Sequence, residues 1–201
     1  MTKEEELILM KAREKFMREG FSKTTVDDIA SELRMSKKTI YKYFSSKEKL
    51  VMAAVELLQQ SILHQVSSRI DGDGNAVQKI YSIFEFVGKL LQKLDERALE
   101  DFRVRIPEVW EKIDQFRTKM ITENFTRVID QGKEEGLIIN YPTEIIMAIY
   151  MASIRAVINP DFVMNNRFSI DEVKNIAIDL MMNAILTEKG KEIYNNSKAG
   201  K

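Results

Sequence analysis

The segment from Lys37 to Phe44 combines ammonium, hydroxyl and aromatic side chains at helical spacing. Ile40 and Phe44 are four residues apart, so they lie on one face of a helix and are expected to face the core. The outward face then carries Lys37, Lys38, Thr39, Tyr41, Lys42 and Tyr43. Lysines neutralise phosphates, and polar side chains that reach a groove can contact base edges. This segment therefore has the chemistry of a nucleic-acid recognition helix.

The charge around this segment supports the same interpretation. The chain has 31 basic and 31 acidic residues in total, but residues 33–49 contain six basic residues and only Glu48 as an acid. Such a patch suits a polyanion. A solvated helix face would explain the charge alone, and only the position of the patch within a motif favours nucleic acid.

The residues that most enzymes require are missing from the sequence. There is no cysteine and His64 is the single histidine. No phosphate-binding glycine loop, nucleophile elbow, His-Glu-x-x-His or dinucleotide fingerprint occurs. Asp71–Asn75 begins like a calcium loop, but Ala76 stands where glycine is needed and Ser82 where the bidentate glutamate is needed. We expect no enzyme activity, no cofactor and no metal.

The sequence also predicts a cytoplasmic protein that does not enter a membrane. Residues 1–10 carry three glutamates before a short apolar patch, unlike a signal peptide. Residues 145–158 are apolar except for Arg155 and are shorter than the roughly 20 residues that span a bilayer. The absence of cysteine suits a reducing compartment.

Scarce proline and glycine, together with apolar residues at helical spacing, predict an all-α fold of about nine helices. Gly20 is expected to end the first helix, Thr24 or Thr25 to cap the second, and Ser36 the third. Ser169 and Glu172 form a capping box for the last. The polar tail 189–201 is predicted to be frayed. The expected helices are 3–19, 26–33, 37–44, 46–69, 76–94, 97–105, 107–135, 143–158 and 169–187.

Two stretches, 20–30 (GFSKTTVDDIA) and 35–50 (MSKKTIYKYFSSKEKL), agree in residue type and spacing with a known DNA-binding domain. They resemble the N-terminal helix-turn-helix domain of tetracycline-repressor (TetR) family regulators. The resemblance implies that the third helix enters the major groove, with Lys37, Lys38, Thr39, Tyr41 and Lys42 facing bases. It also implies phosphate contacts from Thr25, Tyr43 and Lys47. Ser36 completes the candidate DNA-binding set.

The sequence departs from many relatives at one position of this helix. They have glycine where Lys38 stands, and the small residue lets the backbone approach DNA. Lys38 can read a guanine or contact only a phosphate, and the sequence leaves both open.

The resemblance implies two domains, a DNA-binding domain at 1–50 and a ligand-sensing and dimerisation domain at 51–201, connected by the helix at about 46–69. The family places its effector cavity among the fourth to eighth helices. Aromatic residues at this spacing are more often core than pocket. The candidate pocket residues are the aromatic Phe84, Phe102, Trp110, Phe116 and Tyr150 and the polar His64, Arg103, Arg105 and Asn124.

Arg155 lies within an apolar run, and a buried unpaired cation would be too costly. We expect it to meet a carboxylate, water or ligand. An intersubunit ion pair or a helix-end position is favoured over effector binding. An anionic amphiphile would suit it if it lies in the pocket.

The resemblance also implies a homodimer built from residues 143–158 and 169–187, the most continuously apolar pair of helices. Two-fold symmetry would place two recognition helices about one DNA turn apart and predicts a palindromic operator.

The expected function is therefore that of a sequence-specific regulator, commonly a repressor, released from double-stranded DNA by a small hydrophobic or amphipathic effector. The alternative is a DNA-binding dimer controlled by a partner protein or by its own abundance.

Overall fold

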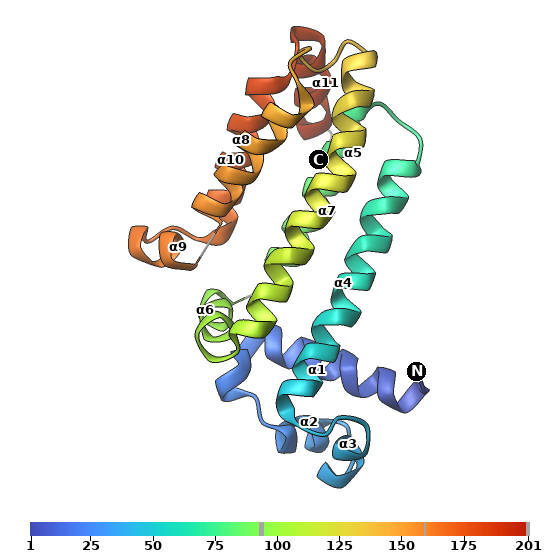
Figure 1. Cartoon of the computed structure of the whole chain (residues 1–201), viewed down its shortest axis with the longest axis vertical. Helices are drawn as coiled ribbons and strands as arrows, with labels where there is room; N and C mark the ends of the chain where they lie inside the picture. The colour runs from blue at the N-terminus through green and yellow to red at the C-terminus, as the bar shows by residue number, and fades with distance from the viewer. Residues whose placement is uncertain (93–94, 159, 200–201) are drawn as a thin grey trace. The chain divides into compact units, whose positions relative to one another are not determined.

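The computed structural model describes residues 1–92, 95–158 and 160–199, and these residues form an all-α fold. Within them there are eleven helices, two more than expected. They are α1 (Lys3–Lys23), α2 (Val26–Glu32), α3 (Lys37–Tyr43), α4 (Lys47–Asp71), α5 (Ala76–Leu91), α6 (Glu96–Arg105), α7 (Pro107–Glu134), α8 (Thr143–Val157), α9 (Pro160–Asn166), α10 (Ile170–Ile185) and α11 (Glu188–Ala199) (Figure 1).

The helices α9 and α11 are the two that the sequence interpretation lacks. The prediction of a frayed tail was wrong, because α11 buries Tyr194 and Gly190 although most of its residues are polar. A methyl group at position 190 would lie 2.2 Å from the Leu137 carbonyl oxygen, so the backbone of α11 approaches that loop closely. The predicted end of the fifth helix at residue 94 lies outside the described residues.

Side-chain caps fix where several helices begin. Thr25, rather than Thr24, caps α2, and Asn75 caps α5 at the end of the turn that resembled a calcium loop. The predicted Ser36 cap and the capping box of Ser169 with Glu172 are both confirmed. Among the described residues, no group of three or more His, Cys, Asp or Glu could hold a metal ion.

The chain divides into two compact units, which we describe separately. The first contains residues 1–62 and 93–116, and the second contains 63–92 and 117–201. The helices α4 and α7 contribute residues to both. The functional division near residue 50 stays a prediction.

In the first unit, α1, α2, α3 and the start of α4 surround a common core (Figure 1). Phe16, Ile29, Ile40, Leu50 and Phe102 are among the buried residues that make it. Each such side chain contributes on the order of 1.5–3 kcal/mol when fully buried. The core therefore fixes α3 on the platform of α1 and α2.

Gly20 breaks α1 with φ +82°, after which one more turn reaches Lys23. The predicted helix end at Gly20 is therefore a kink. Ser22, in that last turn, donates from its backbone N and its Oγ to the Asp101 carboxylate of α6, each at 2.5 Å. These contacts attach α6 to the end of α1.

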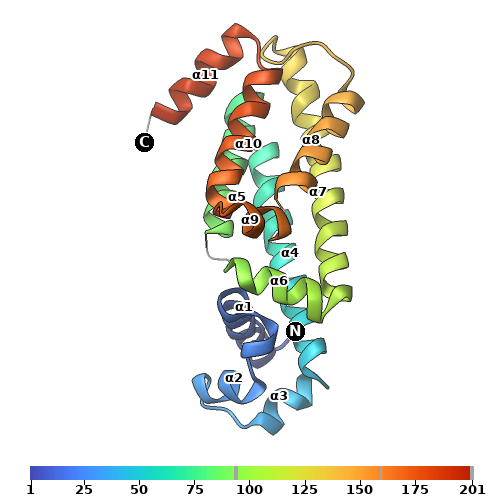
Figure 2. The same ribbon diagram turned by 90° about the vertical axis from the view of Figure 1, so that its left-hand side faces the viewer.

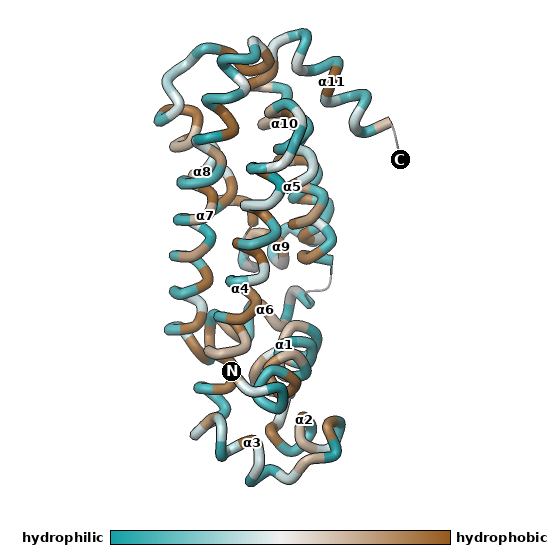
Figure 3. The backbone as a smooth tube through the Cα atoms, turned by 90° about the vertical axis from the view of Figure 1, so that its right-hand side faces the viewer, coloured by the Kyte–Doolittle hydropathy of each residue, from teal (hydrophilic) through white to brown (hydrophobic). Residues whose placement is uncertain are grey.

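In the second unit, α8 and α10 lie side by side and α11 packs on α5 (Figure 2). Only one face of α8 is buried, since Ile145 and Ile149 remain more than half exposed. Within the described residues, no helix is both long enough and apolar enough to cross a membrane. Figure 3 shows hydrophilic residues recurring along the long helices α4 and α7.

Candidate functional site

The turn between α2 and α3 sets the direction of the candidate recognition helix. The Met35 N–H donates to the Ala30 carbonyl at 2.9 Å, and the Arg34 N–H donates to the Ser31 carbonyl at 3.1 Å. This is the hydrogen-bond pattern of a Schellman motif, which usually has glycine at its left-handed position. Here Arg34 occupies that position with φ +54°. The turn therefore holds a strained residue, at a cost of about 1–2 kcal/mol.

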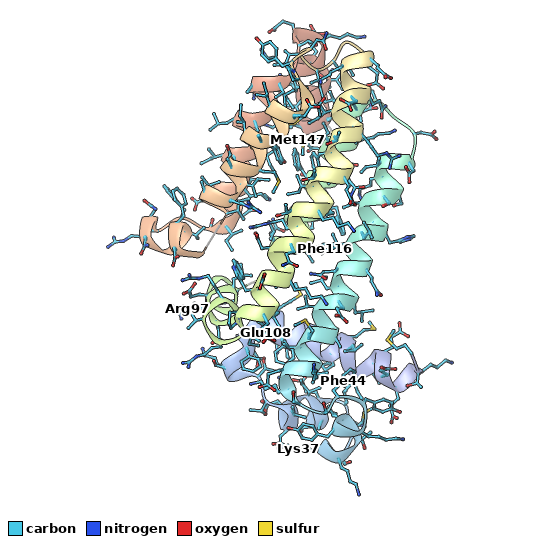
Figure 4. All side chains as sticks on the ribbon, viewed as in Figure 1. Lys37, Phe44, Arg97, Glu108, Phe116 and Met147 are labelled. Carbon is cyan, nitrogen blue, oxygen red and sulfur yellow. The ribbon has the colours of Figure 1, made fainter. Side chains whose placement is uncertain are left out.

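The helix α3 is anchored on one side and exposed on the other. Ser36 Oγ accepts the Thr39 N–H at 3.0 Å and caps the helix. Ile40 is fully buried, and Phe44, directly after the helix, is 6% exposed. Figure 4 shows Lys37 at the outer edge of the three-helix domain and Phe44 among its side chains. The inward face and the exposure of Lys37, Lys38, Tyr41 and Lys42 are as predicted, but Thr39 and Tyr43 are half-buried and Tyr43 packs against the core, so its outward placement was wrong.

The three lysines of α3 are exposed but differ in their neighbours. Lys37 Nζ donates to Asp27 Oδ2 at 2.7 Å, and this hydrogen bond raises the pKa of Lys37. Lys42 Nζ lies 5.5 Å from the centre of the Tyr43 ring. Among the described residues, no carboxylate pairs with Lys38 or Lys42. These two ammonium groups are thus the ones on α3 that are free to meet phosphate or base edges.

Two hydroxyl groups of the predicted DNA-binding set already donate to carboxylates. The Tyr43 hydroxyl donates to Glu4 Oε2 at 2.5 Å, and the pKa of Tyr43 is raised mainly by this bond. The Thr25 hydroxyl donates to Asp28 Oδ2 at 2.6 Å while accepting the Asp28 N–H. A hydroxyl has a single proton to donate. Each must therefore exchange its partner before it can donate to a phosphate.

Lys47 stands at the start of α4, where the resemblance implies a phosphate contact. Its Nζ lies 4.0 Å from the centre of the Phe21 ring, a cation–π contact. Partial burial lowers the pKa of Lys47. Phe21 thus positions a cation beside the free N–H groups of a helix start, an arrangement that favours anions.

The candidate pocket residues of the second unit include one aromatic pair that is in contact. The Phe84 and Tyr150 rings stack with centroids 6.3 Å apart, and Phe125, which the sequence interpretation left out, lies 5.5 Å from both. Burial raises the pKa of the Tyr150 hydroxyl. Phe125 lies in α7, and its apolar type at a helical core position was the sequence signal that could have identified it.

The polar candidates of this unit do not gather around the aromatic cluster of Phe84, Phe125 and Tyr150. His64 is exposed, and Asn124 is buried with its amide donating to the Met120 carbonyl of its own helix at 2.8 Å. Arg155 is exposed in the last turn of α8, and its Nη2 donates to Thr118 Oγ1 at 2.9 Å. The favoured alternative of a helix-end position for Arg155 is confirmed, and its assumed burial was wrong for the single chain.

The remaining candidates lie in the first unit. Phe102 is 4% exposed and packs edge-on against Phe16 with centroids 6.4 Å apart. Arg103 donates twice to Glu100 on the same helix. Arg105 is exposed, while Trp110 and Phe116 are half-buried. The structure thus places Phe102 in the core that holds α1 against α6.

The buried platform, the tight turn and the exposed, capped α3 define a helix-turn-helix DNA-binding protein. Residues 8–61 match the family model described as bacterial regulatory proteins, tetR family. The chain is 25% identical over 174 residues to the HTH-type transcriptional regulator YvaF of Bacillus subtilis (strain 168), covering 85% of this chain and 89% of that protein. Residues 8–61 thus match the DNA-binding domain of the tetR family of bacterial regulatory proteins, and most of the chain is similar to an HTH-type transcriptional regulator.

Solved structures share the fold over most of the chain. A transcriptional regulator from Cytophaga hutchinsonii ATCC 33406 matches with a TM-score of 0.67 and 19% identity, covering 90% of this chain and 98% of that one. FadR from Bacillus subtilis, solved with stearoyl-CoA, matches with a TM-score of 0.63 and 17% identity, covering 88% and 96%. At these identities the likeness establishes the fold alone.

Proposed function

We propose that this regulator is a repressor that binds a palindromic operator as a homodimer and leaves it when a small hydrophobic or amphipathic effector binds. The observation that carries the DNA-binding part is α3, which is fixed by Ile40 and Phe44 and presents free ammonium groups on its exposed face. A rigid helix with cationic and hydroxyl side chains can enter the major groove.

We assign the DNA contacts to two groups of residues. Lys38, Thr39, Tyr41 and Lys42 face bases or nearby phosphates, with Lys37 at the edge of this face. Thr25, Tyr43 and Lys47 hold phosphates, together with the N–H groups at the starts of α2 and α4. Ser36 acts by capping α3.

The homodimer is supported by an apolar surface on α8 and α10. Ile145 and Ile149 on α8 are 56% and 62% exposed, and Ile176 and Leu180 on α10 are 59% and 69% exposed. The two helices pack against each other, so these four side chains can form one patch. Contiguous exposed apolar side chains of this size mark protein interaction sites. A second copy would cover them in a symmetric four-helix contact.

The effector is assigned to the aromatic cluster of Phe84, Phe125 and Tyr150 in the second unit. The Tyr150 side chain is only 6% exposed, and its hydroxyl makes no hydrogen bond to another described residue. This hydroxyl can therefore donate to a ligand. A ligand with an apolar body and one polar atom would suit this site, and the stearoyl-CoA in the FadR structure of similar fold supports an amphipathic compound.

Fluorescence anisotropy tests DNA binding, using a duplex from upstream of the gene across a salt series. Lys42→Ala and Tyr43→Ala are expected to weaken binding, and Lys42→Ala to reduce the slope of log affinity against log salt by about 1 per contact. Lys189→Ala, an exposed lysine of α11, is the matched control. Weak binding that ignores sequence and both substitutions would contradict the assignment.

Two further measurements separate the other parts of the proposal. Ile149→Glu combined with Leu180→Glu should convert a dimer into a monomer in light scattering coupled to size exclusion, with no loss of helicity. A thermal-shift screen of hydrophobic compounds should find ligands that stabilise the protein, and Tyr150→Phe should reduce that stabilisation. A complete lack of hits would favour control by a partner protein or by abundance.

A further inference from the structure

A groove of about 440 Å³ lies in the second unit among α5, α10 and α11. Its apolar lining consists of Tyr81 and Phe84 on α5, Ile176 and Ile178 on α10 and Tyr194 on α11. Figure 2 shows α11 leaving the turn after α10 at an angle to that helix. The volume falls within the range of roughly 300–1,000 Å³ that is typical of small-molecule sites.

The most buried charged residue bordering this groove is Lys174. The residue is 7% exposed, and its Nζ donates to Asp171 Oδ1 at 2.6 Å. A methyl group at Gly88 would lie 2.6 Å from this Nζ, so the missing side chain at position 88 makes room for the ammonium. An ammonium carries three N–H donors, and Asp171 is the one acceptor of Lys174 among the described residues. Two N–H donors of Lys174 are therefore left for a further acceptor.

The carboxylates of the groove are already engaged. Asp179 Oδ1 accepts the Tyr194 hydroxyl at 3.0 Å and Lys198 Nζ at 2.6 Å. Glu85 also borders the groove and has an interaction of its own. The bonds to Asp179 hold α11 as the outer wall. The Asp179 carboxylate is thus occupied by α11, whereas Lys174 has Asp171 as its acceptor.

We propose that this groove binds a small amphipathic anion, an aryl carboxylate or aryl sulfonate. The anionic group accepts from Lys174, and the aromatic body packs against Tyr81, Phe84 and Tyr194. The groove shares Phe84 with the aromatic cluster of Phe84, Phe125 and Tyr150, but Lys174 lies outside that cluster, and the proposal does not depend on DNA binding. A hydrogen bond from an ammonium to an anionic oxygen is shorter and stronger than one between neutral groups.

Titration of the full-length protein with 1-anilinonaphthalene-8-sulfonate, followed by fluorescence, tests this site. We expect one site per chain, displaced by 2-naphthoate and not by 2-naphthylmethylamine. Lys174→Met, which keeps the apolar length and removes the ammonium, should weaken binding at least tenfold. Lys189→Met makes the same change at an exposed position of α11 and should leave binding unchanged.

Equal affinity in Lys174→Met and Lys189→Met would overturn the proposal, as would preferential displacement by the amine. Loss of binding in Tyr150→Phe with full binding in Lys174→Met would place the probe in the aromatic cluster instead. Circular dichroism melts check that the variants fold. Should Lys174→Met unfold, Tyr194→Leu carries the test: it removes one aromatic wall and should weaken binding, and unchanged binding would equally refute the site.

Discussion

Replacing Asp27 by Asn should strengthen DNA binding and make it more sensitive to salt. In the free protein Asp27 Oδ2 lies 2.7 Å from Lys37 Nζ, and both side chains are about half exposed or more. The carboxylate offsets the charge of Lys37 and repels phosphates that approach α3. Asparagine removes both effects. Exposed ion pairs contribute little to stability, so the fold should be unaffected.

The size of the effect follows from counterion release. Each additional lysine that neutralises a phosphate steepens the slope of log affinity against log salt by about 0.9. A dimer has two copies of Lys37, so the slope should steepen by about 1.8. Over the range from 50 to 200 mM salt this is about a 12-fold larger loss of affinity than the wild type shows.

Fluorescence anisotropy with one labelled duplex at four or more salt concentrations measures this slope. Asp73→Asn, which removes an exposed acid from the turn before α5, controls for the change in net charge. Asp27→Glu keeps the acid and should behave like the wild type. An unchanged or shallower slope in Asp27→Asn would refute the reasoning and would mean that Asp27 positions Lys37 or that Lys37 does not reach a phosphate.

Three predictions concern stability and are measured by calorimetry. Burial alone would raise the pKa of Asp101, but hydrogen bonds from Ser22 outweigh burial and lower this pKa from its usual 3.8. The ionised Asp101 therefore stabilises the fold above pH 3.8, and this stabilisation is lost as the pH falls through the lowered pKa. Asp101→Asn should therefore cost about 1–2 kcal/mol at pH 7 and reduce the loss of Tm toward pH 3. Gly190→Ala, whose new methyl would overlap the Leu137 carbonyl, should cost about 1–3 kcal/mol. Phe102→Ala should cost about 3–5 kcal/mol, as in a packed core.

Each of these has an outcome that contradicts it. An Asp101→Asn variant with the same acid dependence as the wild type would show that the Ser22 bonds do not hold in solution. An unchanged Tm in Gly190→Ala would mean that α11 is not docked at Leu137. A loss below about 1 kcal/mol in Phe102→Ala would indicate that Phe102 lines open space rather than the core.

Local signals predicted most of the helix boundaries from the sequence. The caps at Ser36 and Ser169 and the break at Gly20 depend on residues within four positions of one another, so one sequence is enough to find them. The helix α11 could not be predicted this way. Its stability comes from Tyr194 and Gly190 meeting distant segments, while its own composition is polar.

The sequence could predict which side chains of the candidate site are exposed, but not the hydrogen bonds that they make. Periodicity identified the exposed lysines of α3, because Ile40 and Phe44 fix the rotation of the helix, but it wrongly placed Tyr43 outward. It could not show that Tyr43 donates to Glu4, 39 residues earlier, or that Lys37 pairs with Asp27. Such long-range bonds depend on tertiary packing. They decide which donors are free before DNA arrives.

The helix α10 connects the two proposed surfaces of the second unit. Lys174 and Asp179 border the groove, Leu180 belongs to the proposed dimer contact on the same helix, and Ile176 belongs to both. A helix moves as a rigid element, so a ligand that shifts α10 against α5 also moves the α10 side chains that form the proposed dimer contact. Linkage then requires the reverse effect. Loss of the dimer through Leu180→Glu should therefore change the affinity of the groove for an aryl sulfonate, and an unchanged affinity would show that the two surfaces of α10 act independently.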